Sequence, residues 1–169
     1  MSYSSRILSA LAAILASVGV TSTAAQAQGG PIKIGVLAPL TGPLATPGAD
    51  MVDGFKLFWE QNQSMAGGRK VEVVVADTTC NPDQALTLAR RLVHQDKVNF
   101  IVGPLCGHEG PAVAQVSKET GVPVLMDTAG ADNITKWDRT PTVVRTAVSA
   151  SQIGHPSATT FTRNSAPAT

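Results

Sequence analysis

Segments with two different apolar periodicities alternate along this chain, and that alternation restricts the fold more than any other feature. Short runs rich in valine, isoleucine and leucine have the composition of buried β-strands, at 32–38, 71–76, 100–102, 123–126 and 142–148. Between them, apolar residues recur at helical spacing, at 48–63, from Asn81 onwards and at 111–120. Strands and helices that alternate with short connections predict an α/β fold with one doubly wound parallel sheet.

The predicted helices carry start signals and apolar faces that can be assigned to particular residues. Asn81 followed by Pro82 is a strong helix start, because asparagine caps the first turn and proline needs no N–H partner there. The inward stripe of this helix is predicted at Ala85, Leu86, Ala89, Leu92 and Val93. In the preceding helix, Phe58 and Trp59 are expected to lie in the core rather than to form a stacking platform.

The stretch 98–111 joins a strand, a glycine-rich loop and the start of a helix. Phe100–Val102 is a short β-favouring run, and glycines at 103, 107 and 110 break the chain after it. Pro111 suits the first turn of the following helix. Free backbone N–H groups at such a junction favour an anion, and ligands on doubly wound sheets bind beyond the carboxyl ends of the strands. Three loops are expected at that edge, at 39–45, 105–110 and 127–132.

The first 27 residues have the order of a secretory signal peptide. Arg6 precedes an apolar run from Ile7 to Val20, and small residues follow it as far as the sequence Ala-Gln-Ala at 25–27. The run is shorter than the ~20 residues that span a bilayer, which disfavours the alternative of an uncleaved membrane anchor. We expect cleavage of residues 1–27 before Gln28 and export to the periplasm as a soluble protein.

The mature chain that this cleavage leaves is balanced in charge. The whole chain has 13 Lys and Arg and 12 Asp and Glu, and the leader holds one of the basic residues. The absence of a basic cluster argues against nucleic acid or an anionic membrane surface as a partner. About 142 residues suffice for one domain with a real core.

A series of short motifs runs through residues 33–124 in an order and spacing that resembles one known family. They are KIGVLAPLTGPLA at 33–45, Gly54-Phe55, GGRKV at 67–71, DTTCNPDQA at 77–85, FIVGPLC at 100–106 and GVPV at 121–124. Together they resemble the branched-chain amino-acid (leucine/isoleucine/valine-binding) class of periplasmic substrate-binding proteins, the receptors of ABC uptake transporters. The resemblance implies the fold of a type I periplasmic binding protein lobe. In that family two α/β lobes enclose the ligand, and residues 28–155 cover an incomplete first lobe.

The resemblance implies the solute-binding component of an ABC importer rather than an enzyme. The solute would be a branched-chain amino acid or a similar small carboxylate or amide, a membrane permease would be the second partner, and no cofactor would be needed. The ligand contacts of the first lobe map onto two loops, at Leu105, Cys106, Gly107, His108, Thr128, Ala129 and Gly130. Gly107 and Gly130 stand where the family usually has hydroxyl side chains, and Pro47 replaces a frequent aromatic residue. An aromatic acid is therefore an equally reasonable ligand.

The two cysteines of the chain, Cys80 and Cys106, follow the second and third predicted strands. Leucine/isoleucine/valine-binding proteins carry a disulfide at matching positions, and an exported chain with two cysteines is expected to pair them. In the expected strand order 2-1-3-4-5, the first strand lies between these two strands, so the loops must lean together to bring the Cα atoms within about 5.5 Å. The alternative is two free buried thiols.

The loop that holds Cys106 also contains His108 and Glu109, which together suggest a thiol nucleophile with a base, or a metal site. Three such neighbours in one loop do not generally form a nucleophile–base–orienter line, and a disulfide would occupy the sulfur. The loop also lacks the Gly-Lys-Ser/Thr ending of a phosphate-binding P-loop. We therefore predict a polar loop with no catalytic residue and no metal.

The segment 156–169 is rich in Ser, Thr, Ala and Pro and has no apolar periodicity, which predicts disorder. Family-like sequence fades near Gln152, and a frameshift near His155-Pro156 would explain the change. Two alternatives to the binding protein stay open. One is a secreted single-domain α/β protein with a thiol-based enzymatic or redox role that uses Cys106, and the other is an inactive truncated fragment.

Overall fold

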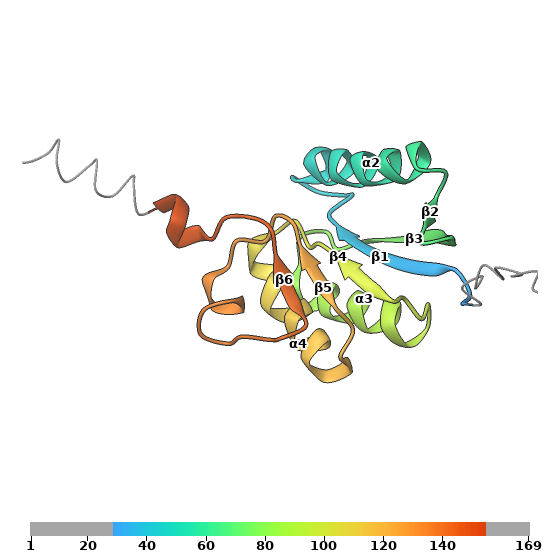
Figure 1. Cartoon of the computed structure of the whole chain (residues 1–169). Helices are drawn as coiled ribbons and strands as arrows, with labels where there is room; N and C mark the ends of the chain where they lie inside the picture. The colour runs from blue at the N-terminus through green and yellow to red at the C-terminus, as the bar shows by residue number, and fades with distance from the viewer. Residues whose placement is uncertain (1–28, 155–169) are drawn as a thin grey trace, which may run out of the picture.

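The computed structural model describes residues 29–154, and its centre is a six-stranded sheet (Figure 1). The strands follow the order β2-β3-β1-β4-β5-β6, and every neighbouring pair is parallel except β2 and β3. Their bounds are β1 Ile32–Ala38, β2 Met65–Ala66, β3 Arg69–Asp77, β4 Phe100–Val102, β5 Val124–Met126 and β6 Val143–Arg145. The predicted doubly wound parallel sheet is confirmed, together with its order. The predicted signal peptide and the tail after residue 155 lie outside the described residues.

Helices cover both faces of this sheet. They are α2 Ala45–Gln61, α3 Pro82–His94 and α4 Gly110–Thr120. Figure 1 shows α2 on one side of the sheet and α3 and α4 on the other. Two short 3-10 helices, Gly107–Glu109 and Asp132–Ile134, lie in the loops that follow β4 and β5. Among residues 29–154, no helix is both long enough and apolar enough to cross a membrane.

The central strand β1 is buried from both sides, which explains its nearly continuous apolar sequence. Ile34 and Val36 belong to the core beneath α2, whereas Leu37 belongs to the core beneath α3 and α4. A Cβ atom added at Gly35 would lie only 2.9 Å from Cδ1 of Leu92 in α3. Glycine at this position therefore lets the helix approach the strand closely.

Asn81 caps α3 as predicted. Its side-chain oxygen accepts hydrogen bonds from the backbone N–H of Asp83 at 2.9 Å and from that of Gln84 at 3.1 Å. Pro82 occupies the first turn, where its missing N–H leaves no partner unsatisfied. The helix therefore begins where the sequence indicated, directly after the loop that holds Cys80.

The buried faces of the helices match the prediction with one exception. In α3, Ala85, Ala89 and Leu92 are fully buried. In α2, Trp59 packs against the core, but Phe58 is 55% exposed, so the prediction that Phe58 lies in the core was wrong. The Phe58 ring packs edge-on against Trp59, with the ring centroids 5.2 Å apart, and therefore covers the outer side of the indole.

β2 and β6 differ most from the prediction. β2 was not predicted, because two residues show no alternation; it pairs with β3 through a turn in which Gly67 and Gly68 have φ of 55° and 77°. β6 ends at Arg145 instead of residue 148. Its neighbour β5 has already ended at Met126, so the chain beyond Thr146 has no strand partner.

Replacement of Asn81 by alanine should lower the free energy of unfolding by about 1 kcal/mol, because two N–H groups of the first turn of α3 lose their acceptor. Urea denaturation followed by circular dichroism measures this change. Asn81→Asp, which keeps a capping oxygen, is the matched control and should stay close to the wild-type midpoint. Equal losses in both variants would contradict the capping role.

Candidate functional site

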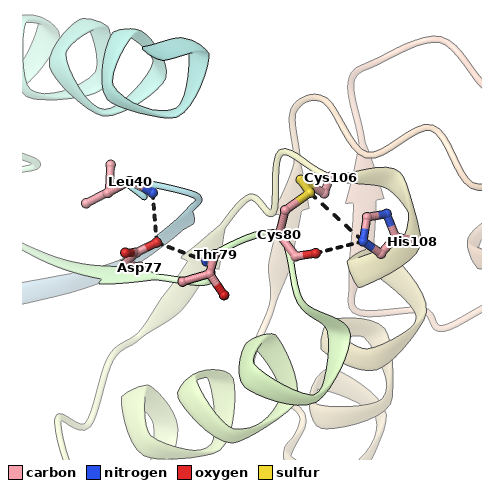
Figure 2. Close-up of a disulfide and its surroundings, with 6 residues drawn as sticks. All are labelled: Leu40, Asp77, Thr79, Cys80, Cys106 and His108. Carbon is pink, nitrogen blue, oxygen red and sulfur yellow. Dashed lines mark hydrogen bonds between the residues drawn. A yellow bond between two sulfur atoms is a disulfide. The ribbon is translucent and has the colours of Figure 1, made fainter. Parts of the chain in front are cut away.

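A disulfide joins Cys80, in the loop after β3, to Cys106, in the loop after β4 (Figure 2). The two Cα atoms are 5.7 Å apart. Because β1 lies between β3 and β4 in the sheet, these loops meet only by reaching past the carboxyl end of β1. The predicted pairing is present, and it leaves no free cysteine among the described residues.

Asp77, at the end of β3, fixes the turn that follows β1 to the loop that leads to Cys80. Its carboxylate accepts hydrogen bonds from the backbone N–H of Leu40 at 2.8 Å and from the N–H of Thr79 at 2.9 Å (Figure 2). It also accepts a hydrogen bond from the hydroxyl of Thr41 at 2.7 Å. Burial raises the pKa of Asp77, but these hydrogen bonds together outweigh burial and hold the pKa below its usual range. The carboxylate therefore stays charged and keeps both loops in place.

His108 lies directly beside the disulfide (Figure 2). Its Nε2 atom is 2.8 Å from the carbonyl oxygen of Cys80 and 3.9 Å from the Cys80 sulfur. A carbonyl oxygen can only accept, so the proton of the neutral ring must be on Nε2. This hydrogen bond is a second connection, besides the disulfide, between the loops after β3 and β4.

Glu109, the next residue, is fully buried although it is charged in isolation. Neither carboxylate oxygen has a hydrogen-bond partner, and the same is true of the buried hydroxyl of Thr78. Burial raises the pKa of Glu109. Three nearby donors oppose this rise in pKa, namely the Thr78 hydroxyl and the backbone N–H groups of Cys106 and Asn81. None of them forms a well-aligned hydrogen bond with the carboxyl group. A buried carboxyl group without a hydrogen-bond partner is rare in folded proteins. One oxygen of Glu109 lies within 4.8 Å of both sulfurs of the disulfide.

An open cavity of about 680 Å³ lies at the carboxyl ends of β4, β5 and β6. This volume is in the range of small-molecule sites, which extends from about 300 to 1,000 Å³. Its lining comes from three segments and is mostly apolar, with Gly107, His108, Asp127, Thr128, Gly130, Ala131, Ala147, Val148, Ala150 and Ile153. The position agrees with the rule that ligands bind at this edge of a doubly wound sheet.

Four of the seven residues predicted to contact a ligand line this cavity, namely Gly107, His108, Thr128 and Gly130. A Cβ atom added at Gly107 would lie 3.7 Å from the backbone nitrogen of Gly130, so the two predicted loops meet. Leu105 is half-buried, Cys106 is buried in the disulfide and Ala129 is buried in the core, and none of them lines the cavity. The first predicted loop, 39–45, also contributes no lining residue.

The cavity includes residues that were not among the predicted ligand contacts. Asp127 follows β5 directly and belongs to the predicted loop 127–132, but it was not predicted to contact a ligand. Its Oδ1 atom is buried without a hydrogen-bond partner. Burial raises the pKa of Asp127, and hydrogen bonds from the backbone of Asp127 and from Thr128 oppose that shift without cancelling it. The wall at 147–153 had no signal in the sequence.

That third wall is held in place by Asp132 and Arg145. The Asp132 carboxylate accepts hydrogen bonds from the N–H of Ser151 at 3.0 Å and from its hydroxyl at 2.9 Å, and forms an ion pair with Lys136 at 3.1 Å. Burial raises the pKa of Asp132, but its bonds with Ser149, Lys136 and Ser151 outweigh burial and lower the pKa to about 2. Arg145 donates to the carbonyl of Ala131 at 2.8 Å, which fixes the loop after β5.

Another cavity, of about 350 Å³, lies between α4 and the segment 133–140. Polar surface residues form much of its lining, including Gln115, Lys118, Asn133 and Asp138. None of the residues predicted to contact a ligand lines it. The cavity beside Gly107 and Gly130 is therefore the candidate ligand site.

Residues 31–165 match the family described as Periplasmic binding protein, and the chain belongs to this family. The fold is that of a partial lobe of a type I periplasmic binding protein. The family match continues ten residues beyond the boundary predicted at residue 155, and the origin of the tail stays a prediction.

The relatives are solute-binding proteins. The chain is 35% identical over 107 residues to a Leu/Ile/Val-binding protein of Rhizobium johnstonii, an alignment that covers 62% of this chain and 29% of the relative. It is 33% identical over 130 residues to the leucine-, isoleucine-, valine-, threonine- and alanine-binding protein of Pseudomonas aeruginosa, covering 76% and 34%. A solute-binding protein of an ABC transporter from R. palustris, solved in complex with benzoate, is 28% identical with a TM-score of 0.74, covering 80% and 38%. The chain thus spans about a third of the length of the relatives that it matches.

Removal of the disulfide by the double substitution Cys80→Ala and Cys106→Ala should lower the free energy of unfolding by about 3–4 kcal/mol, because the unfolded chain regains the entropy of a closed loop of 26 residues. Urea denaturation without reductant measures the difference. Peptide mapping without reductant should show the two peptides linked in the wild-type protein. Alkylation of both cysteines in unreduced protein would contradict the bond.

Replacement of Glu109 by glutamine should stabilise the protein at neutral pH. The folded state raises the pKa of Glu109, so it binds the proton more tightly than the unfolded state, and stability falls as pH rises from about 4.3 through the raised pKa. The gain from Glu109→Gln should therefore be largest at neutral pH and shrink below about pH 4, where both side chains are neutral. Thermal unfolding across this pH range measures the effect.

Glu119→Gln is the control for this experiment, because hydrogen bonds from Gln115 and Arg90 lower the pKa of the exposed Glu119 carboxyl group. It should give no gain at neutral pH. A gain from Glu109→Gln that is the same at every pH would show that ionisation of Glu109 is not its cause.

Proposed function

We propose that this chain supplies the first-lobe part of the solute-binding component of an ABC importer. We further propose that its cavity binds the carboxylate end of a small solute with an apolar body. The observation that carries the proposal is that Gly107 and Gly130 lie side by side in the wall of the cavity. At these two positions the cavity is lined by backbone, because glycine has no side chain. Membership of the binding-protein family supports the same function.

The chemistry of the cavity suits a carboxylate on one side and an apolar group on the other. Gly107 begins the 3-10 turn that leads directly into α4, and the partial positive charge at the start of such a helical segment favours an anion. His108 and Thr128 add hydrogen-bonding side chains. Val148 and Ile153 supply apolar surface opposite them.

Two classes of solute fit this arrangement. A branched-chain amino acid is favoured by Asp127, because its buried, unpartnered oxygen at the cavity wall could accept hydrogen bonds from an ammonium group. An aromatic carboxylate is favoured by the mostly apolar lining of the cavity and by the missing side chain at Gly107, where an added Cβ atom would meet no atom closer than 3.7 Å. The names of the relatives include both kinds of ligand, leucine and benzoate.

We assign binding and no catalytic step to the site. The alternative of a thiol-based enzyme would need the sulfur of Cys106, which is bonded to Cys80. The partners in this proposal are the solute and a membrane permease, and the compartment is the periplasm, as for the class of the relatives. One lobe offers only part of the contacts of a two-lobe site, so the chain alone should bind weakly, since each 1.4 kcal/mol lost is about a factor of ten.

An NMR titration of the purified chain with leucine and, separately, with benzoate tests this proposal. Shifts should cluster at 107–108, 127–131 and 147–153. Gly107→Leu should weaken binding by about tenfold or more, because the new side chain enters the cavity. The fold should stay intact, because the added Cβ lies at van der Waals distance, 3.7 Å, from the Gly130 nitrogen.

Gly54→Leu is the matched control, because Gly54 lies on the exposed side of α2 and an added Cβ meets no atom within 4 Å. It should bind as the wild type does. Shifts confined to the opposite edge of the sheet, or equal binding by Gly107→Leu, would show that the solute binds elsewhere.

A further inference from the structure

Four side chains of the kinds that ligate zinc converge where the loops after β3 and β4 meet. They are Cys80, Cys106, His108 and Glu109 (Figure 2 shows the first three). We propose that, when the disulfide is reduced, these side chains bind one Zn²⁺ ion. The site would belong to the reduced protein alone, because a sulfur in a disulfide is not a thiolate ligand.

The distances between the ligand atoms already approach those of a zinc site. One carboxylate oxygen of Glu109 and the sulfurs of Cys80 and Cys106 all lie within 4.8 Å of one another, and Nε2 of His108 is 3.9 Å from the Cys80 sulfur. In a tetrahedral site, Zn–S bonds of about 2.3 Å and Zn–O or Zn–N bonds of about 2.0–2.2 Å place ligand atoms roughly 3.3–3.8 Å apart. To complete the site, the two bonded sulfurs must move apart by roughly 1.5–2 Å. The His108 ring must also move closer, because it is not among the three residues whose ligand atoms all lie within 4.8 Å of one another.

The loops can accommodate this separation. Cys80 lies in a turn after β3, where Thr79 and Cys80 have φ of 52° and 58°, and it makes no ladder contact with a neighbouring strand. Cys106 follows β4 and precedes the 3-10 turn. Neither cysteine is part of a strand, so a shift of each sulfur does not require the sheet to move.

Glu109 is the independent observation that points to a cation. Its carboxyl group is fully buried, and neither oxygen has a hydrogen-bond partner. A cation between this carboxylate and two thiolates would supply the missing partner. The nearby Thr78 hydroxyl, also buried and without a hydrogen-bond partner, could then donate to the second carboxylate oxygen as a supporting contact.

His108 would be the fourth ligand and the entrance to the site. Its Nε2–H now donates to the carbonyl of Cys80, so the ring must give up that bond and carry its proton on Nδ1 to bind the metal. The side chain is exposed, whereas Cys106 and Glu109 are buried, so the ion would enter from the side of His108.

The chemistry balances with a named reductant. A phosphine and one water molecule reduce the disulfide to two thiols, and the phosphine becomes its oxide. Zn²⁺ then binds both sulfurs as thiolates and releases two protons. Because the zinc-bound sulfurs are held apart, the ion should also slow reoxidation to the disulfide.

The test uses the purified chain, reduced with a phosphine that is then removed under anaerobic conditions, and Co²⁺ as a spectroscopic substitute for Zn²⁺. One equivalent of Co²⁺ should give the absorption bands of a tetrahedral site with thiolate ligands, and Zn²⁺ should displace it. The oxidised chain should show no such bands. Absence of the bands in the reduced chain would overturn the proposal.

Variants separate this site from general thiol binding. Glu109→Gln preserves the shape of the buried side chain and should weaken Co²⁺ binding by at least about tenfold, since loss of even an outer-sphere group costs 10–100-fold. Cys106→Ser should abolish the thiolate bands or reduce them by half. His94→Ala, which removes an exposed histidine at the end of α3, is the control and should bind as the wild type does.

Folding of each reduced variant is checked by circular dichroism before titration. If Cys106→Ser does not fold, Glu109→Gln alone decides the question. Unchanged affinity in a folded Glu109→Gln would show that the carboxylate is not a ligand and would overturn the four-residue site.

Discussion

The burial of β1 between two layers of helices is the constraint on which the rest of the structure depends. Ile34 and Val36 face α2, while Leu37 faces α3 and α4, so the strand is apolar on both sides. β3 and β4 pair with its two edges, and their loops therefore start on opposite sides of its carboxyl end. The disulfide between Cys80 and Cys106 joins the loops after β3 and β4, which the sheet separates by the width of β1.

The cavity results from this arrangement, but each of its walls is fixed by a different kind of interaction. Close approach of backbone at Gly107 and Gly130 brings the first two walls together. The third depends on charge, through the bonds of Asp132 to Ser151 and of Arg145 to the loop after β5. The ligand space is thus bounded by rigid backbone on one side and by a segment held by side chains on the other.

The strands of the sheet and the start of α3 could be predicted because each depends on a local pattern, such as the apolar run at 32–38 or the cap at Asn81. The strand order depends on pairing between distant segments and was expected only from the fold class. The pairing of Cys80 with Cys106 could be predicted mainly through the family resemblance. The wall at 147–153 could not be predicted, because the segment has no pattern of its own and is held by a contact between Ser151 and Asp132, 19 residues earlier in the chain. The burial of Glu109 also gave no signal, since a glutamate in a polar loop is usually exposed.

The disulfide makes a covalent ring of the chain from Cys80 to Cys106, and the whole of α3 lies inside that ring. A single cut by a protease anywhere within the ring would open it without releasing either piece. The two parts would stay joined through sulfur and could keep their places in the sheet, because β3 and β4 both remain paired with β1. Such a nick would change the connectivity of the chain without loss of the folded molecule.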